Sequence, residues 1–293
     1  MRFTALVPSR IAAGIALALS LAAPAQAQPS FNALAETVAG IEARLGARVG
    51  VALVDTGSDR NWTHRADERF LMNSTVKVPV CAAILARRDA GLLRLSQTLP
   101  VTRDDLLSYA PVAETRVGGS MTLSELCLAA IDMSDNTAAN LLIGALGGPA
   151  EVTQFFRDIG DPVSRLDRVE PDLNSAGPGD PRDSTTPVAM ADTLWAILIE
   201  DALSPGSRAQ MAEWMRPGGV TGALLRASAP AGWDILDKSG AGERNRNLVA
   251  VITPPGRAPW IAVLMLADLE ADVATRNAAL QELGAAVVAV IGT

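Results

Sequence analysis

The residues best suited to chemistry begin with Ser74-Thr75-Val76-Lys77, where a hydroxyl is followed three positions later by an amine. If a helix begins here, residues three apart share one face, so the Lys77 amine would lie beside the Ser74 hydroxyl. A helix N-terminus also supplies unpaired N–H groups and a field that favours developing negative charge. The pattern is typical of a serine nucleophile, although S-x-x-K alone is weak evidence.

Two further short motifs combine hydroxyl, amide and amine groups. Ser134-Asp135-Asn136 falls between two helical runs, where these residue types are also the common helix N-caps. Lys238-Ser239-Gly240 ends a predicted strand and also fits a strand that runs into a glycine turn. Each motif alone favours that plain structural interpretation. Yet the chain's only lysines, Lys77 and Lys238, both fall inside these motifs, and lysine can be tuned for proton transfer whereas arginine stays charged.

Composition excludes several other classes of function. One histidine and two cysteines cannot supply the usual zinc ligands, so we expect no metal and no cofactor. A Ser-His-Asp hydrolase would need His64 as its base, and His64 lies in a segment typical of an outer strand. The net charge of −7 and the few aromatic residues argue against a nucleic-acid partner.

The first 27 residues are typical of a secretory signal peptide. Arg2 and Arg10 precede an apolar run that is shorter than the roughly 20 residues of a membrane-spanning helix, and Ala25-Gln26-Ala27 fits a cleavage site. We therefore expect cleavage near Gln28 and a secreted, periplasmic protein without a membrane span. Loss of the two arginines would leave a net charge of about −9.

Export bears on the two cysteines, Cys81 and Cys127. In an oxidising compartment a cysteine pair is expected to form a disulfide, which would stabilise a chain with this loop length by roughly 4 kcal/mol. The alternative is two buried free thiols. We expect the bridge and assign it a structural role.

The order of predicted elements indicates how these motifs are positioned. A strand near residues 49–54, helical patterns in the middle of the chain and strands near 233–239, 247–252 and 260–267 suggest that both chain ends build one sheet around an inserted helical domain. We expect a signal peptide, a sheet domain and an all-α domain carrying the nucleophile, at residues 1–27, at 28–64 with 217–293, and at 65–216. Residues 165–183 are too rich in proline for a helix and predict a packed Ω-type loop.

Taken together, the three motifs resemble those of the class A serine β-lactamases, S-x-x-K, S-D-N and K-T-G, with Ser239 in place of threonine. Glu170-Pro171-Asp172-Leu173-Asn174 and the run from Lys238 to Arg244 add to the resemblance, which covers essentially the whole mature chain. It implies an α/β (α+β) fold of the β-lactamase/transpeptidase type. That fold has an antiparallel five-stranded sheet flanked by helices, built from both chain ends, with an inserted all-helical domain.

The resemblance also implies a reaction: hydrolysis of the β-lactam amide of penicillins through an acyl-enzyme on Ser74. The backbone N–H groups of Ser74 and Ala241 would form the oxyanion hole, a role worth roughly 2.7 to 4 kcal/mol per donor. Lys77 would help to activate Ser74, and Ser134 would pass a proton to the departing ring nitrogen. Glu170, assisted by Asn174, would activate the water that releases the product.

Two questions about these roles stay open. The acylation base could be Lys77 or Glu170. A carboxylate about 4 Å from an ammonium interacts by roughly 4 kcal/mol at an effective dielectric near 20 and would keep Lys77 protonated, so we favour Glu170 acting through water. The second cation for the substrate carboxylate could be Arg246 or its competitor Arg244, because the turn after Ser239 is one residue shorter than in familiar relatives.

Other residues take binding or structural roles by the same resemblance. The expected substrate-binding residues are Asn136, Asn174, Lys238, Ser239, Gly240, Tyr109 and Arg246. Asn136 would bind the substrate's side-chain amide, Lys238 and Ser239 its carboxylate, and Tyr109 would form an aromatic wall at the entrance. A salt bridge between Arg168 and Asp183 would close the Ω-loop.

One difference from some relatives bears on the range of substrates. Some carbapenem-hydrolysing relatives join the residue before the nucleophile to the terminal strand by a disulfide, and here those places hold Asn73 and Gly242. We therefore expect penicillins and early cephalosporins as the substrates, with β-lactam resistance as the consequence. We also expect the enzyme to be a monomer. The rival interpretations are a penicillin-binding D,D-peptidase and a β-lactam-binding sensor, both of which would keep the acyl adduct.

Overall fold

The computed structural model describes residues 31–177 and 179–293, so the expected signal peptide at residues 1–27 lies outside the described residues. The described α-helices are α1 (Asn32–Leu45), α2 (Lys77–Asp89), α3 (Leu123–Asp132), α4 (Asn136–Leu146), α5 (Pro149–Asp158), α6 (Pro187–Leu198), α7 (Pro205–Met215) and α8 (Val273–Gly292). The described strands are β1 (Arg48–Asp55), β2 (Asn61–His64), β3 (Phe70–Leu71), β4 (Thr98–Pro100), β5 (Ser120–Thr122), β6 (Ser184–Thr185), β7 (Asp234–Ala241), β8 (Arg246–Thr253) and β9 (Trp260–Ala267).

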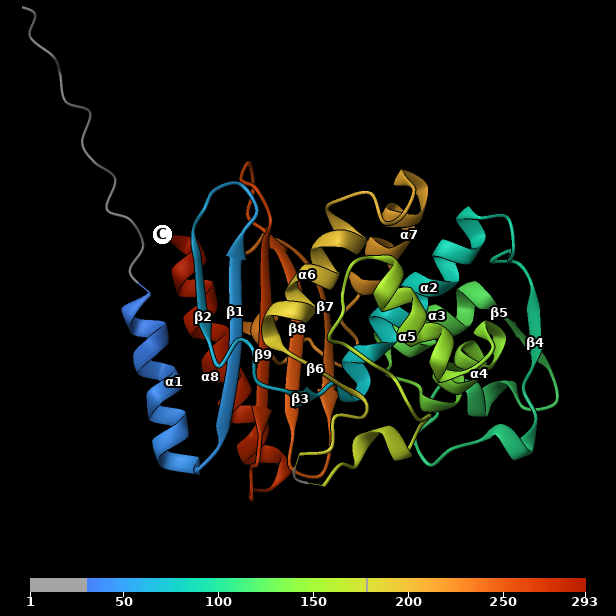
Figure 1. The fold of residues 1–293 in the computed structure, drawn as a ribbon, viewed down its shortest axis with the longest axis horizontal. Coiled ribbons are helices and arrows are strands. Elements are labelled where there is room, and N and C mark those ends of the chain that lie inside the picture. Colours follow the sequence, from blue (N-terminus) through green and yellow to red (C-terminus); the bar gives the residue numbers. More distant parts are fainter. Residues whose placement is uncertain (1–30, 178) are drawn as a thin grey trace, which may run out of the picture.

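The main sheet joins the two ends of the described chain. Its five antiparallel strands run in the order β2-β1-β9-β8-β7, so the first long strand pairs with the last. Helices α1 and α8 pack together on one side of the sheet, and α6 lies against β1 and β9 on the other (Figure 1). The expected five-stranded antiparallel sheet flanked by helices and built from both chain ends is confirmed.

The central strands are apolar over most of their length because both faces of the sheet are covered. In β8, Leu248, Ala250 and Ile252 face the core shared with α1 and α8, while Val249 and Val251 face the core of the helical region. This alternation follows from the two-residue period of a strand. The sheet therefore separates two apolar cores and holds β7 at the boundary with the helical region.

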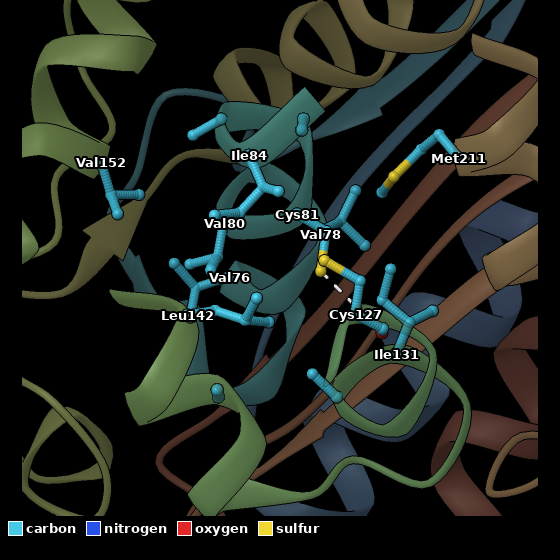
Figure 2. Close-up of a cluster of buried hydrophobic side chains, with 14 of the residues drawn as sticks. Val76, Val78, Val80, Cys81, Ile84, Cys127, Ile131, Leu142, Val152 and Met211 are labelled. Carbon is cyan, nitrogen blue, oxygen red and sulfur yellow. Dashed lines mark hydrogen bonds between the residues drawn. The ribbon is translucent and has the colours of Figure 1, made fainter. Parts of the chain in front are cut away.

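Helix α2 forms the centre of the helical region. Every residue of α2 from Lys77 to Leu85 is buried, and α3, α4, α5 and α7 pack around it. Figure 2 shows side chains from these helices gathered around α2, among them Ile131, Leu142 and Met211. A helix enclosed on all sides has little freedom to shift, so the residues at its first turn are held rigidly.

The two cysteines correct one expectation from the sequence. Cys81 of α2 and Cys127 of α3 face each other in this core (Figure 2), but both are free thiols, and the Cys81 Sγ donates to the Cys127 carbonyl oxygen at 3.9 Å. Both side chains are fully buried among apolar neighbours. A buried cysteine behaves as a small apolar side chain, so each sulfur is accommodated without the expected disulfide.

The last helix, α8, closes the sheet side of the molecule. Asp272 caps its N-terminus by accepting a hydrogen bond from the Thr275 backbone N–H at 2.7 Å. Its inner face places Leu280, Leu283 and Val287 in the core against the sheet. Neither α8 nor any other helix in the described part of the chain is long and apolar enough to cross a membrane.

The sheet and the helical region suggest a division of the chain. The strands of the main sheet come from Arg48–His64 and from Asp234–Ala267, and α2 to α7 lie between these two segments in sequence. We propose that the sheet domain comprises residues 28–64 and 217–293, and the helical domain residues 65–216. Helix α6 joins the two, because it lies within the helical segment in sequence but packs on β1 and β9.

Candidate active site

The predicted nucleophile lies at the junction of a 3-10 turn and a helix. The turn η1 (Asn73–Val76) leads directly into α2, so Ser74 and Lys77 lie on one face across this junction. The Lys77 Nζ donates to the Ser74 Oγ at 3.1 Å. This is the contact that the three-residue spacing predicts. The core around α2 holds the Lys77 side chain in place, and the amine at its end points at the serine.

Ser134-Asp135-Asn136 forms the corner between α3 and α4. The Asp135 carboxylate caps α4 by accepting from the Ala138 backbone N–H at 2.8 Å, so the capping interpretation holds for that residue. Ser134 and Asn136 turn the other way, towards Lys77. Its Nζ donates to the Ser134 carbonyl oxygen at 2.8 Å and to the Asn136 Oδ1 at 2.6 Å. One motif thus serves both as a cap and as a wall of the site.

The second lysine approaches the same hydroxyl from the sheet. Lys238 lies in β7, fully buried, and its Nζ donates to the Ser134 Oγ at 3.0 Å. The Lys77 Nζ is 3.4 Å from that oxygen on its other side. Burial lowers the pKa of Lys238 well below its ordinary value, and the positive charge of Lys77 lowers it further. Two amines and two hydroxyls therefore meet in one place.

Glu170 brings a carboxylate to the same amine from the long loop. Its Oε1 is 3.3 Å from the Lys77 Nζ, and neither side chain is exposed. Its Oε2 accepts a hydrogen bond from the Asn174 Nδ2 at 2.6 Å. Burial lowers the pKa of Lys77, while the Glu170 carboxylate acts to raise it, and the net direction is downward. For the pKa of Lys77, burial therefore outweighs the effect of the carboxylate, which was the effect expected from the sequence.

Asn140 holds the backbone of Glu170 and was not identified as a site residue from the sequence. Its Oδ1 accepts from the Glu170 N–H at 2.9 Å, and its Nδ2 donates to the Glu170 carbonyl oxygen at 2.8 Å. Asn140 lies one helical turn after Asn136 in α4, on the same face. That spacing was the signal available in the sequence.

The loop that carries Glu170 is closed at its base. The Arg168 Nε donates to the Asp183 Oδ2 at 2.6 Å, and the other carboxylate oxygen of Asp183 accepts from the backbone N–H groups of Asp167 and Arg168 at 2.7 and 2.9 Å. Asp183 is buried. The expected pair is formed, and it joins the two ends of the segment that contains Glu170.

Strand β7 packs directly on the backbone beside the nucleophile. A Cβ atom at Gly240 would lie 2.9 Å from the Met72 carbonyl oxygen and 3.2 Å from the Ser74 backbone nitrogen. Only glycine permits this close approach. This close approach brings Ala241, the residue after Gly240, to the edge of the site. Ser239, the residue before Gly240, is buried.

The remaining expected residues line the rim. The two candidate cations differ: the Arg246 Nη1 donates to the Gly240 carbonyl oxygen at 3.0 Å, whereas Arg244 is exposed and pairs with Glu270 at 3.0 Å. The Arg246 Nε donates to Asn277 of α8 at 2.7 Å, a contact that the sequence did not reveal. Tyr109 is 47% exposed, and its carbonyl oxygen accepts from the Asn136 N–H at 3.0 Å.

The described residues offer no group of three or more histidine, cysteine, aspartate or glutamate side chains that could hold a metal ion. The site is instead a cluster of hydroxyls, amines and one carboxylate, brought together by η1, α4, the long loop and β7. Such a cluster can attack a carbonyl, move a proton to a leaving group and activate a water.

Comparisons with known proteins agree with this chemistry. A model of the beta-lactamase enzyme family (Beta-lactamase2) matches residues 33–291. A beta-lactamase from Rhodobacter capsulatus is 64% identical over 291 residues, which cover 99% of each chain. The structure of an ancestral class A beta-lactamase (GNCA) is similar with a TM-score of 0.84 and 51% identity, covering 87% of this chain and 98% of that one. A beta-lactamase from Xanthomonas campestris pv. campestris gives a TM-score of 0.86 at 45% identity, covering 88% and 97%.

Proposed function

The chain belongs to the class A β-lactamases, enzymes that hydrolyse β-lactams, and we propose that it works through an acyl-enzyme on Ser74 that is released by water activated by Glu170. The observation that supports this most directly is the position of the Lys77 Nζ, which lies 3.1 Å from the Ser74 Oγ and 3.3 Å from the Glu170 Oε1. One buried amine thus connects the nucleophile with the carboxylate.

In the proposed acylation step, the Ser74 Oγ attacks the lactam carbonyl carbon and loses its proton to the base. The backbone N–H groups of Ser74 and Ala241 stabilise the oxyanion. When the tetrahedral intermediate collapses, the C–N bond breaks and the ring nitrogen takes a proton from the Ser134 Oγ. The two amines beside that oxygen favour its transient negative charge, because Lys238 and Lys77 lie 3.0 and 3.4 Å away. The proton that Glu170 received from Ser74 then passes through the Lys77 amine to the Ser134 oxygen, so the Ser134 hydroxyl and the Glu170 carboxylate are both restored before deacylation.

The base for acylation is proposed to be Glu170, acting through a water molecule. The ion pair with Glu170 favours the protonated form of Lys77, which cannot accept the serine proton. The opposing influence is burial, which lowers the pKa of Lys77. Titration of Lys77 in the free enzyme decides between the two bases, since a neutral Lys77 at the working pH would overturn this part of the proposal.

In the proposed deacylation step, Glu170 takes a proton from the water that attacks the ester carbonyl. The tetrahedral intermediate then expels the Ser74 oxygen, which recovers a proton, and the product leaves as a carboxylic acid. Asn174 and Asn140 support this role because they fix the carboxylate and the backbone of Glu170 respectively. A rigidly held base is what general-base catalysis requires.

We further propose penicillins and early cephalosporins as substrates, with β-lactam resistance as the consequence. The substrate carboxylate would bind at Lys238, Ser239 and Arg246, and Asn136 would bind the side-chain amide. Arg246 is favoured over Arg244 because it lies against β7, whereas Arg244 faces Glu270. The places joined by a disulfide in some carbapenem-hydrolysing relatives hold Asn73 and Gly242, which supports the narrower range.

Mass spectrometry of the intact protein mixed with benzylpenicillin tests the acyl-enzyme. The wild-type protein should return rapidly to its free mass, Glu170→Gln should accumulate an adduct, and Ser74→Ala should form none. A lasting adduct on the wild-type protein would instead indicate a D,D-peptidase or a sensor. A panel of penicillins, cephalosporins and carbapenems then measures the substrate range.

We also propose that the enzyme acts as a monomer after export and removal of residues 1–27. The sequence of that segment, with two arginines before an apolar run and a small-residue cleavage site, supports export. N-terminal sequencing of the periplasmic protein should give a start near Gln28, and light scattering should give the mass of one chain. A start at Met1 or a dimer mass would contradict these points.

A further inference from the structure

Three side-chain amides form a line from strand β8 to the Glu170 carboxylate. The Asn247 Nδ2 donates to the Asn73 Oδ1 at 3.0 Å, and the Asn73 Nδ2 donates to the Asn174 Oδ1 at 3.0 Å. The Asn174 Nδ2 then donates to the Glu170 Oε2 at 2.6 Å. We infer that Asn73 and Asn247 are positioning residues for deacylation, acting on Glu170 through Asn174. This inference rests on the proposed role of Glu170 as the base.

The direction of the line is fixed at both ends by groups that can only accept. At the β8 end, the Asn247 Nδ2 also donates to the carbonyl oxygens of Leu71 and Met72, at 2.8 and 3.3 Å. The Asn247 amide must therefore present its nitrogen to this end of η1, and Asn73 must present its oxygen. At the other end, an ionised carboxylate accepts from the Asn174 nitrogen. Each amide thus sets the orientation of the next.

The line is enclosed, so water has little access to replace it. Asn73 and Asn247 are both fully buried. A Cβ atom at Gly242 would lie only 2.7 Å from the Asn73 Nδ2, which shows how closely the turn after β7 covers this amide. In a buried site, hydrogen bonds are electrostatically stronger than in water, and a chain of them is mutually polarising. The three amides are therefore expected to act together on the carboxylate.

The backbone at Asn73 adds a second reason for this residue type. Asn73 has a φ of 49°, in the left-handed region that asparagine and glycine tolerate best. It directly precedes the nucleophile Ser74, so its conformation sets the start of the turn that carries the serine. Asparagine satisfies both demands, a left-handed backbone and a side chain that can accept and donate at once.

The line gives the two oxygens of Glu170 different surroundings. Oε2 is held by Asn174, while Oε1 faces the Lys77 Nζ and, in the proposed reaction, the attacking water. Loss of the Asn73 donor would leave the Asn174 oxygen without this partner, and only the Pro171 carbonyl oxygen and Glu170 itself would still hold the Asn174 nitrogen. The carboxylate would then sample orientations that no longer suit the water. Deacylation should slow more than acylation, because the attacking water depends on Glu170 alone, whereas the Ser74 Oγ is also held by the Lys77 Nζ at 3.1 Å.

The test uses Asn73→Gly, which keeps the left-handed backbone without strain and removes only the amide. Stopped-flow and steady-state kinetics with benzylpenicillin should show deacylation slowed roughly two- to tenfold, the equivalent of one net hydrogen bond. Because deacylation is slowed more than acylation, kcat and KM should fall together and kcat/KM should stay within about twofold. In an Asn174→Ala background, Asn73→Gly should cause no further change.

Three results would overturn the inference: deacylation at the wild-type rate, a fall in kcat/KM as large as that in kcat, or a full additional effect in the Asn174→Ala background. If Asn73→Gly does not fold, Asn247→Ser tests the line from its other end and leaves the backbone at Asn73 unchanged. Glu170→Gln separates the two proposals. Turnover of benzylpenicillin at the wild-type rate in that variant would sink the proposed base, whereas a lasting adduct there with unchanged Asn73→Gly kinetics would sink the amide line alone.

Discussion

The Lys77 Nζ lies 3.3 Å from the Glu170 Oε1, and both side chains are fully enclosed. The same nitrogen donates to Ser74, Asn136 and the Ser134 carbonyl oxygen, so a single amine connects the carboxylate with the other polar groups of the site. Burial lowers its pKa and the carboxylate opposes that change. The protonation of Lys77 is therefore set by two large effects of opposite sign.

Removal of the carboxylate should lower the pKa of Lys77 further. In Glu170→Gln the favourable charge is lost while the burial remains, so Lys77 should release its proton at a lower pH than in the wild-type enzyme. NMR of lysine labelled with ¹³C at Cε suits the measurement, because the chain contains only Lys77 and Lys238. Lys238→Arg assigns the two signals. An unchanged or higher Lys77 midpoint in Glu170→Gln would show that the ion pair contributes little.

Loss of Arg168 should loosen the loop and slow deacylation. Arg168→Ala leaves the buried Asp183 carboxylate with its backbone donors but without its cation, at a cost of roughly 1 to 3 kcal/mol in unfolding free energy. Denaturant unfolding and the lifetime of the penicillin adduct measure the two effects. Arg182→Ala is the matched control, since Arg182 pairs with Asp180 in the same loop but on its exposed side. Equal behaviour of the two variants would count against a special role for the buried pair.

Arg246 and Arg244 should differ sharply in substrate binding. Arg246→Ala removes a cation beside β7 and should lower kcat/KM for penicillins roughly ten- to a hundredfold, the worth of a charge-assisted hydrogen bond. Arg244→Ala removes an exposed cation that faces Glu270 and should change kcat/KM by less than about twofold. The reverse ranking would reassign the carboxylate site to Arg244.

Gly240→Ala should damage acylation rather than stability alone. The added Cβ would lie 2.9 Å from the Met72 carbonyl oxygen and 3.2 Å from the Ser74 nitrogen, so β7 and the nucleophile must move apart. A displacement approaching 1 Å can cost on the order of a hundredfold in rate. The acylation rate from stopped-flow fluorescence checks this. Gly222→Ala is the control, because its Cβ would be 3.5 Å from the nearest atom, an ordinary contact, and its acylation should match the wild type.

Much of the sheet could be predicted from the sequence because its signals are local. The apolar runs near residues 247–252 and 260–267 correspond to β8 and β9, where both faces are buried and no polar alternation is needed. The two-residue strands β3 and β6 carry too little pattern to be recognised. They depend on pairing between distant segments, with Phe70 opposite Thr185.

Site residues that belong to a short motif could be predicted from the sequence. Residues that act by holding those site residues in place could not. The lysine and serine motifs fix residue types at short spacing, and Lys77 meets Ser74 as that spacing predicts. Asn140 and Asn277 act through contacts made by the fold. Asparagine is common in caps and turns, so even the helical spacing of Asn140 from Asn136 does not by itself mark a site residue. The expected disulfide was wrong because the redox compartment alone does not determine whether two cysteines are bridged, and the packing of α2 against α3 accommodates two separate thiols.

The pairing of β1 with β9 also constrains how the polypeptide matures. Val51 lies opposite Leu264, so the first long strand has no neighbour on that side until nearly the whole chain has been synthesised. A nascent protein that ends before β9 keeps an apolar strand edge uncovered and can be captured by other chains. The sheet can therefore close only after β9 has been synthesised.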